Sequence, residues 1–179
     1  MLNRGTENLN YQKFTEELDN LKTQLYISGS ATGVRVDVAT IKENLPRVLD
    51  LIHDALRKPA FAESEFNQLV NNTMMQLEEA RLDPQTIAMD LVAKQLNYWP
   101  SEDPRYYRNT AEKIEQLKSV TLADAKNFWQ AYYGANYADV SLIGDFDADE
   151  VKAALQSKFG DWYAKKIYQR VPNPYHATS

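Results

Sequence analysis

Two adjacent carboxylates, Glu78 and Glu79, lie in the middle of the segment MMQLEEARLDPQ, which runs from Met74 to Gln85. The segment reads as part of a long helix, and a carboxylate on a helix can ligate a metal ion. A metal site takes three or four ligands, so most of them would have to come from elsewhere in the chain. These glutamates either belong to such a site or form the solvated face of an ordinary helix.

The two histidines do not supply the remaining ligands. His53 lies in DLIHDAL beside an apolar helical stripe, and His176 lies in the C-terminal tail. Neither stands in an H-E-x-x-H or H-x-x-E-H motif, the two spacings that place zinc ligands on one helix. We interpret His53 as a surface or half-buried structural residue rather than a catalytic one.

A run of acidic residues resembles the start of a calcium-binding loop. DFDADE places Asp145, Asp147 and Asp149 at alternate positions. The sixth loop position should be glycine and is Glu150, and the twelfth should be glutamate and is Gln156. Helix capping explains these acids more simply than calcium binding does.

Other catalytic classes have no support in the sequence. The chain has no cysteine, no G-x-S-x-G elbow, and six scattered glycines that form no phosphate-binding loop. Seven aromatic residues could line a peptide groove, although packing in the core and at its rim is the interpretation we favour. They are Tyr98, Trp99, Tyr106, Tyr107, Trp129, Tyr132 and Tyr133.

The composition is that of a globular domain of 179 residues, with 44% hydrophobic and 25% charged residues. The net charge of −5 comes without a basic stripe, so nucleic acid is not an expected partner. No apolar run approaches the ~20 residues that a membrane span needs, and MLNRGTENLN does not have the build of a signal peptide. The absence of cysteine is compatible with both the periplasm and the cytosol.

Hydrophobic periodicity predicts the elements that position these residues. Helices are expected over 11–25, 45–56, 66–82, 84–96, around 114–117, over 121–132 and over 151–159, and strands over 25–30, 33–40 and 137–146. Asn44, Asp83, Thr121 with Asp124, and Asp147 are expected to cap the helices that follow them. We expect one α+β domain over 1–168, with helices on one face of a small, mostly antiparallel sheet, and a linker or tail over 169–179.

Four segments resemble, in order and spacing, the pitrilysin/insulinase family of zinc metallopeptidases, whose motif is H-x-x-E-H. They are MLNRGT, ENLPRVLDLIHDALRKPAFAESEFNQL, LEEARLDPQTIAMDLV, and VTLADAKNFWQAYYGANYADVSLIGDFDADEVKAALQSKFGDW. The resemblance implies a protein of two similar halves, each of two α+β domains, that close around an unfolded peptide. Only one half normally carries zinc.

The same resemblance bears on the glutamates. The family's second histidine would align just before Met1, and its third ligand, a glutamate, aligns with about Gln76. Gln76 is neutral and is a poor zinc ligand. Glu78 would replace it only after a shift of two residues, which turns a helix by ~200°. GSATG also replaces the family's Asn-Ala-aromatic segment, so we expect Glu78 and Glu79 to be solvated.

The resemblance therefore implies the first domain of a non-catalytic half, incomplete at its N-terminus. Such a domain would help hold an extended peptide substrate while zinc is bound by a catalytic half in the same or a companion chain. We expect no catalytic residues, metal or cofactor in this segment, no activity alone, self-association, and the bacterial periplasm rather than the cytoplasm. The alternatives are a fragment of the catalytic half whose motif lies upstream, and a non-peptidase core subunit of similar fold.

Overall fold

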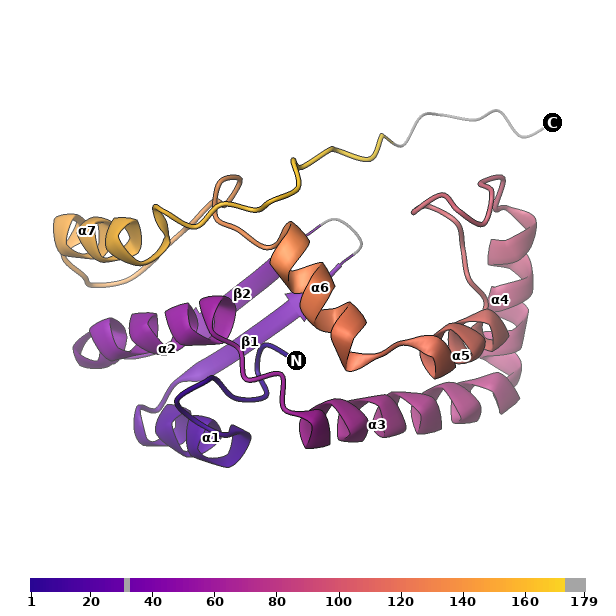
Figure 1. Cartoon of the computed structure of the whole chain (residues 1–179), viewed down its shortest axis with the longest axis horizontal. Coiled ribbons are helices and arrows are strands. Elements are labelled where there is room, and N and C mark those ends of the chain that lie inside the picture. Colours follow the sequence, from indigo (N-terminus) through magenta and orange to yellow (C-terminus); the bar gives the residue numbers. More distant parts are fainter. Residues whose placement is uncertain (31–32, 173–179) are drawn as a thin grey trace. The chain divides into compact units, whose positions relative to one another are not determined.

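The computed structural model describes residues 1–30 and 33–172, and Figure 1 shows the arrangement of their helices and strands. In this part of the chain there are seven α-helices, one short 3-10 helix and two β-strands. In chain order the elements are α1 (Tyr11–Asn20), β1 (Gln24–Gly29), β2 (Val34–Ala39), the 3-10 helix η1 (Lys42–Asn44), α2 (Leu45–Arg57), α3 (Glu63–Leu82), α4 (Pro84–Gln95), α5 (Thr110–Ser119), α6 (Leu122–Tyr132) and α7 (Ala148–Phe159). The expected α+β class is confirmed.

The chain divides into two compact units. The first consists of Phe61–Ala125 with Met1, and the second of Leu2–Ala60 with the chain from Lys126 onward. The first unit therefore holds α3, α4 and α5, and the second holds α1, the hairpin, α2 and α7. Helix α6 begins in the first unit and continues in the second.

The core of the second unit lies between its helices and the hairpin. Phe14 of α1 packs with Leu51 and Ala55 of α2, and all three are buried. Leu25 and Ile27 of β1 pack against this cluster, as do Leu9, Leu18 and Leu21. Because residues two apart in a strand point to the same face, α1 and α2 cover the face of the sheet that carries Leu25 and Ile27. The expected packing of helices on one face is confirmed.

Helix α7 is fastened to α2 by ring packing and by ion pairs. The His53 ring lies 5.9 Å from the Phe159 ring, and Lys158 pairs with Asp50. Arg57 donates to the Lys158 carbonyl at 2.8 Å. These contacts join two helices about a hundred residues apart in the sequence, so α7 belongs to the same unit as α2.

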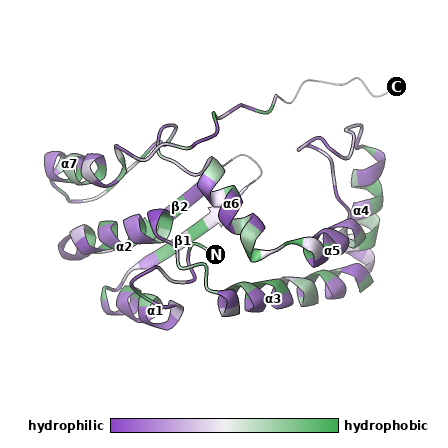
Figure 2. Ribbon diagram, viewed as in Figure 1, coloured by the Kyte–Doolittle hydropathy of each residue, from purple (hydrophilic) through white to green (hydrophobic). Residues whose placement is uncertain are grey.

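The first unit is built around α3, which packs along α5 and contacts α4 (Figure 1). Helix α4 carries apolar residues that remain exposed, among them Met89 and Leu91, which are 63% and 68% accessible. Figure 2 shows this hydrophobic colouring along α4. No buried residue lies on α3 or α4, so the core of this unit is thin.

The prediction of a strand over 137–146 is wrong. This segment has no ladder partner among the described residues, and Ile143 is fully exposed. The alternation of apolar residues there is typical of a strand, but a strand also needs a neighbour to accept its main-chain hydrogen bonds. Lys42, three residues past β2, pairs with Asp145 at 2.8 Å and tethers the end of the segment.

Three of the four capping predictions are confirmed. Asp83 accepts from the Thr86 amide at 2.7 Å, Thr121 and Asp124 cap α6 reciprocally, and Asp147 accepts from the first turn of α7. The prediction for Asn44 is wrong. Its amide group donates to the Leu21 carbonyl at 2.8 Å, and η1 precedes α2 in place of a side-chain cap.

Candidate functional site

The position that the sequence resemblance aligns with a third zinc ligand, about Gln76, lies on α3. Gln76 and Glu79 are exposed there. Glu78 is half-exposed, and its carboxylate pairs with Arg81 one turn further along at 2.9 Å. This is the arrangement of an ordinary solvated helix face, in which residues three apart are neighbours.

The side chains on this helix do not fit zinc. Gln76 offers a neutral amide oxygen, the Glu78 carboxylate is paired with the Arg81 guanidinium, and Glu79 is exposed. Across residues 1–30 and 33–172, no three His, Cys, Asp or Glu side chains converge as a metal site would require. We therefore derive no chemical step through a metal on these residues.

The other candidate ligands are engaged elsewhere. His53 is 21% exposed, and its Nδ1 lies 3.0 Å from the carboxylate of Asp54 on the same helix. Asp145 pairs with Lys42, and Asp147 accepts the Asp149 and Glu150 amides at 3.0 Å. His176 lies outside the described residues. The acids of DFDADE thus tether a loop and cap a helix.

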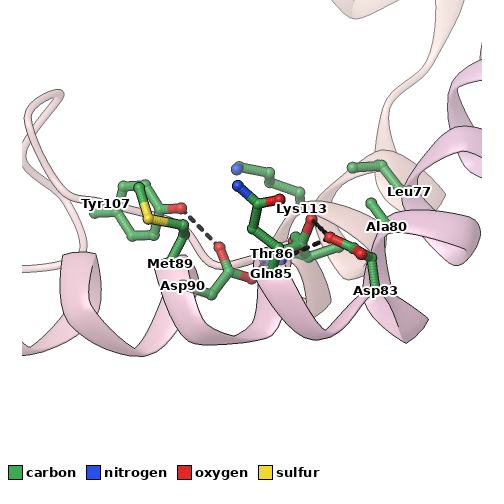
Figure 3. A pocket seen from close by; sticks show the side chains of 10 residues that line it. Leu77, Ala80, Asp83, Gln85, Thr86, Met89, Asp90, Tyr107 and Lys113 are labelled. Atoms are coloured by element: carbon green, nitrogen blue, oxygen red, sulfur yellow. Dashed lines mark hydrogen bonds between the residues drawn. The ribbon is translucent and has the colours of Figure 1, made fainter.

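An open pocket of about 410 Å³ lies between α3, α4 and α5 of the first unit (Figure 3). Leu77 and Met89 contribute apolar walls, and Asp90, Tyr107 and Lys113 contribute polar ones. Figure 3 shows the Tyr107 hydroxyl directed at Asp90. Two of the pocket's carboxylates are engaged by its own residues, since Asp90 accepts from the Tyr107 hydroxyl and Asp83 accepts from the Thr86 hydroxyl.

Both carboxylate oxygens of Asp90 accept hydrogen bonds from neighbouring groups. One carboxylate oxygen accepts from the Tyr107 hydroxyl at 2.6 Å, and the other accepts from the Thr110 amide at 2.7 Å. Desolvation, the largest single contribution, raises the pKa of Asp90, but the hydrogen bonds from Tyr107 and Thr110 together hold it below its usual value. Asp90 is therefore a fixed anion that binds the start of α5.

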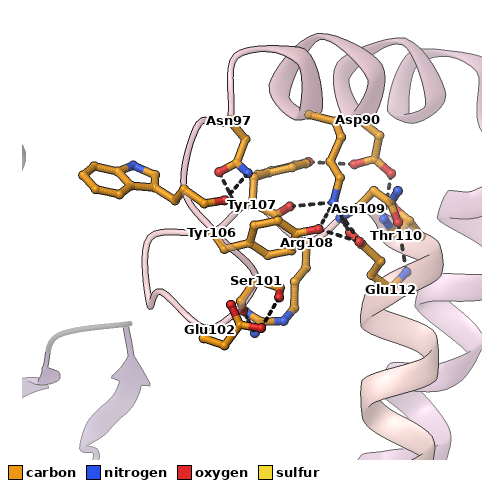
Figure 4. A network of polar contacts seen from close by, with 12 residues as sticks. Asp90, Asn97, Ser101, Glu102, Tyr106, Tyr107, Arg108, Asn109, Thr110 and Glu112 are labelled. Carbon is orange, nitrogen blue, oxygen red and sulfur yellow. Dashed lines mark hydrogen bonds and ion pairs between the residues drawn. The ribbon is translucent and has the colours of Figure 1, made fainter. Parts of the chain in front are cut away.

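A second polar network lies beside the first and fixes the loop between α4 and α5 (Figure 4). Lys94 of α4 pairs with Glu112 of α5 at 2.7 Å, and the Tyr106 hydroxyl donates to the same carboxylate at 2.7 Å. Glu112 also accepts the Asn109 amide at 2.9 Å, and the Asn109 side chain accepts the Glu112 amide, which makes a capping box. The loop is thus anchored by side chains from both helices.

This network lowers the pKa of Glu112 to about 2, chiefly through the hydrogen bond from Lys94, and then through those from Tyr106 and the Asn109 amide. The sequence pattern did not predict it. The only sequence signal was the pair Asn109 and Glu112, spaced as a capping box. The hydroxyls of Tyr106 and Tyr107, two of the seven aromatic residues singled out in the sequence, are engaged in these networks.

The hairpin of the second unit carries unpaired strand edges. Its register runs from Gln24 opposite Ala39 to Gly29 opposite Val34, and Ser30 donates to the Gly33 carbonyl at 2.8 Å in the same register. Since hydrogen-bonded pairs alternate in an antiparallel ladder, the bonded pairs within the hairpin are those of residues 24, 26 and 28 with 39, 37 and 35.

The remaining residues direct their main-chain groups away from the hairpin. On β1 these are Leu25, Ile27 and Gly29, and on β2 they are Val34, Val36 and Val38. In the described part of the chain no hydrogen bond reaches these outward groups. A Cβ placed on Gly29 would meet no atom within 4 Å, so the sheet face to which it would point is open at the end of β1. Such an edge can accept another extended chain.

None of the helices in the described residues combines the length and apolar character that crossing a membrane would need. The structure thus offers the outer edge of β1 as its candidate binding site.

Comparison with curated proteins gives distant relatives that are longer than this chain. The chain is 21% identical over 160 residues to a probable mitochondrial-processing peptidase subunit beta of Arabidopsis thaliana, covering 89% of the chain and 29% of the relative. It is 21% identical over 157 residues to mitochondrial-processing peptidase subunit beta of Saccharomyces cerevisiae, covering 88% and 33%. The chain thus spans about a third of the length of these relatives.

Solved structures share the fold. A peptidase M16 inactive domain from Pseudomonas fluorescens superposes with a TM-score of 0.78 at 17% identity, over 97% of this chain and 42% of that one. A protease from Helicobacter pylori gives 0.69 at 23% identity, over 97% and 41%. The first half of the periplasmic protease PqqL from Escherichia coli gives 0.70 at 17% identity, over 99% and 38%.

Two different parts of the chain match models of known families. Residues 119–179 match the peptidase M16 inactive domain. Residues 1–99, more than half of the chain, match the insulinase family, peptidase family M16. The resemblance seen in the sequence is thereby confirmed, and the chain belongs to the insulinase family of peptidases, M16.

Proposed function

We propose that this chain is a non-catalytic chamber domain of an M16 peptidase-like protein, and that it holds an extended peptide along the outer edge of β1. The observation that carries the proposal is the unpaired row of main-chain groups at Leu25, Ile27 and Gly29. A peptide lying antiparallel or parallel to this edge would gain main-chain hydrogen bonds without regard to its sequence. That mode of binding suits a protein that accepts unfolded chains.

The side chains around this edge support binding rather than cleavage. The exposed face of β1 carries Gln24, Tyr26 and Ser28, none of which can activate water at neutral pH, and the core face is covered by α1 and α2. Zinc and the general base of the reaction would be supplied by a catalytic half in the same or a companion chain. The two halves together would form the complete enzyme.

The compartment is part of the same proposal. The first half of PqqL, a protein with this fold, comes from a periplasmic protease. We propose the periplasm for this chain on that likeness, because a chain without cysteine is compatible with an oxidising compartment. Fractionation of the native cells, with antibody detection of the chain, tests this assignment.

Peptide binding is tested on the full chain with a short, unstructured, fluorescein-labelled peptide of alternating apolar and polar residues. Fluorescence anisotropy should show saturable binding. A matched peptide that is N-methylated at every second residue, on the edge facing β1, should bind roughly tenfold more weakly or not at all, because it lacks the required donors. Equal binding of the two peptides would overturn the proposal.

The chain itself offers a matched pair of variants. Ile27→Pro removes an outward N–H without removing a bond of the hairpin, and should weaken peptide binding at least as much as N-methylation does. Ile27→Ala loses the same side chain but keeps the N–H, so it reports the cost of lost packing alone. If Ile27→Pro and Ile27→Ala bind the peptide equally well, the peptide does not use this edge.

A further inference from the structure

The face of the hairpin that α1 and α2 cover has a gap at the end of β1. Gly29 is the last residue of this strand, and it lies opposite Val34 in the register. Because Gly29 has no side chain, no side chain of β1 stands directly opposite Val34. A Cβ built on Gly29 would meet no atom of the described residues within 4 Å. We call this gap, above Gly29 and beside Val34, the Gly29 notch.

The residues around the Gly29 notch are apolar. Ile27 lies two residues before Gly29 on the same face of β1, and Val36 pairs with Ile27 across the ladder. Both are half-buried. Strand β1 itself, Gln24–Gly29, carries no charged residue. A side chain that enters the notch would therefore displace water from apolar surface without burying a charge, and this favours an apolar occupant.

We propose that the Gly29 notch is a specificity site, which takes an aromatic side chain of the peptide held along the β1 edge. This inference rests on the proposed function, because the notch gains its occupant only when a peptide strand lies beside β1. The main-chain groups of Gly29 point outward, so one residue of a paired peptide lies opposite Gly29 with its side chain on the same face. The substrate class is then an unfolded peptide with an aromatic residue at that position.

The width of the gap favours a ring. Neighbouring strands lie about 4.8 Å apart, so the peptide backbone would lie roughly 9–10 Å from that of β2. A peptide side chain must cross the empty place above Gly29 before it reaches Val34. An aromatic side chain is long and flat enough to lie over the glycine backbone and contact the valine, whereas alanine ends short of it. Aromatic residues cover exposed edge glycines of sheets in the same way.

The opposite face of β1 has no such gap. Gln24, Tyr26 and Ser28 each carry a side chain there, and each faces a residue of β2 that also carries one. Tyr26 is 64% exposed, so it is the rival place against which a peptide ring could pack. Because the two places lie on opposite faces of one strand, substitutions on each face distinguish them.

Fluorescence anisotropy on the full chain tests the inference with three fluorescein-labelled peptides. They share one unstructured sequence in which alanine alternates with polar residues, and a single central alanine is kept or replaced by leucine or phenylalanine. The phenylalanine peptide should bind roughly fivefold more tightly than the alanine peptide, with the leucine peptide between them. Ile27→Pro should weaken binding of all three, because it removes a main-chain donor of the edge.

Gly29→Val is the matched variant, because it fills the notch and keeps the N–H of the edge. Gly29 does not have a positive φ, so a β-branched residue fits its backbone. The variant should reduce the preference for phenylalanine over alanine from roughly fivefold to about one, while the alanine peptide binds as before. Ser28→Val adds a branched side chain on the opposite face and should leave the preference unchanged. Circular dichroism checks that each variant folds.

Methyl NMR spectra of the full chain locate the ring directly. Ring currents from the phenylalanine peptide should shift the Val34 methyl signals upfield, and the alanine peptide should cause no such shift. Val34→Ala should lower the preference for phenylalanine in part, since the ring loses the surface that it reaches. Unshifted Val34 signals at saturating phenylalanine peptide would contradict a ring in the notch.

The remaining outcomes separate this inference from the proposed function. If no peptide binds, or if Ile27→Pro leaves binding unchanged, the proposed function fails and the inference fails with it. If the three peptides bind through the β1 edge with equal affinity, the proposed function stands and the notch is not a specificity site. Loss of the preference in Tyr26→Ala but not in Gly29→Val would assign the ring to the opposite face.

Discussion

Glu112 shows how one side chain can organise a loop that has no secondary structure of its own. Its carboxylate receives Lys94 from α4, the Tyr106 hydroxyl from the loop and the Asn109 amide at the start of α5. Charge-assisted hydrogen bonds are stronger than neutral ones, and a carboxylate with several of them stays ionised at low pH. The charge of Glu112 therefore helps to hold the loop between α4 and α5, beside the contacts that Asp90 makes.

We predict that the stability contributed by Glu112 is pH-dependent. Its pKa is lowered in the folded state from 4.5 to about 2, so the folded state binds the proton less readily than the unfolded state does. The stabilisation is then fully present above about pH 4.5 and is lost as the pH falls toward 2. Urea unfolding at several pH values should show Glu112→Gln less stable than the unaltered chain by about 1 kcal/mol at pH 7. The difference should shrink below pH 4.5.

The control for this prediction lies one turn away. Glu115 is exposed and pairs only with Lys118 on the same helix, so Glu115→Gln removes the same charge with little effect at any pH. Glu112→Ala, which also removes the acceptor for the Asn109 amide, should be less stable than Glu112→Gln. A difference between Glu112→Gln and the unaltered chain that does not change with pH would contradict the role assigned to the charge.

At the scale of elements, the end of α6 is held against the segment that follows α7. The Ala135 amide donates to the Trp162 carbonyl at 2.7 Å, and the Lys166 amide donates to the Ala131 carbonyl at 2.8 Å. Gly134 stands between these bonds. A Cβ at this position would overlap the nitrogen of Ala164 and lie 2.7 Å from the carbonyl carbon of Tyr163. The close approach of two backbones therefore requires glycine here.

We predict that Gly134→Ala destabilises the chain by roughly 1–3 kcal/mol, the range typical of an overpacked contact that forces a backbone shift. Thermal and urea unfolding measure the change. Gly29→Ala is the matched substitution, since a Cβ there meets nothing within 4 Å, and it should alter stability little. Equal effects of the two substitutions would mean that the contact at Gly134 relaxes without cost.

The elements differ in how far the sequence could predict them. The helices were predicted because amphipathic periodicity and caps such as Asp83 are local signals. The strand over 137–146 was predicted wrongly, because alternation is local and a ladder partner is not. The bond between Lys94 and Glu112 joins residues 18 apart on different helices, and no local pattern reports such a contact. The outward edge of β1 could be placed only once the hairpin register was known.

At the scale of the whole molecule, membership in the insulinase family raises the question of which half of a peptidase this chain represents. The donor chemistry of α3 answers it in part. At about the position where the sequence resemblance places the zinc-ligating glutamate of a catalytic half, this chain has the exposed amide of Gln76. The match of residues 119–179 to the inactive domain agrees with this assignment. We therefore propose that this chain keeps the family fold without the zinc ligand expected at that position.

We predict that the isolated chain retains no stoichiometric zinc and does not hydrolyse unstructured peptides. Zinc-dependent hydrolysis needs a metal that acidifies a bound water and a base that accepts its proton, and α3 presents an amide and two solvated glutamates in their place. Elemental analysis after dialysis against micromolar zinc should find far less than one ion per chain. Cleavage of a quenched fluorogenic peptide should stay at the level of the buffer, with and without added zinc.

The zinc content and the peptide cleavage test different parts of this prediction, so a contrary result in each has a different meaning. One contrary result is that the chain binds about one zinc ion, which is lost in Glu78→Ala or Glu79→Ala. That result would show that the alignment with the family is shifted by two residues, so that Glu78 takes the ligand position. Chelator-sensitive cleavage without such a loss would instead point to ligands outside residues 1–30 and 33–172, where His176 lies. The proposed chamber domain should bind peptide without cleaving it. This binding should be abolished by Ile27→Pro and should not change when a chelator is added, because the chemistry would occur in the other half.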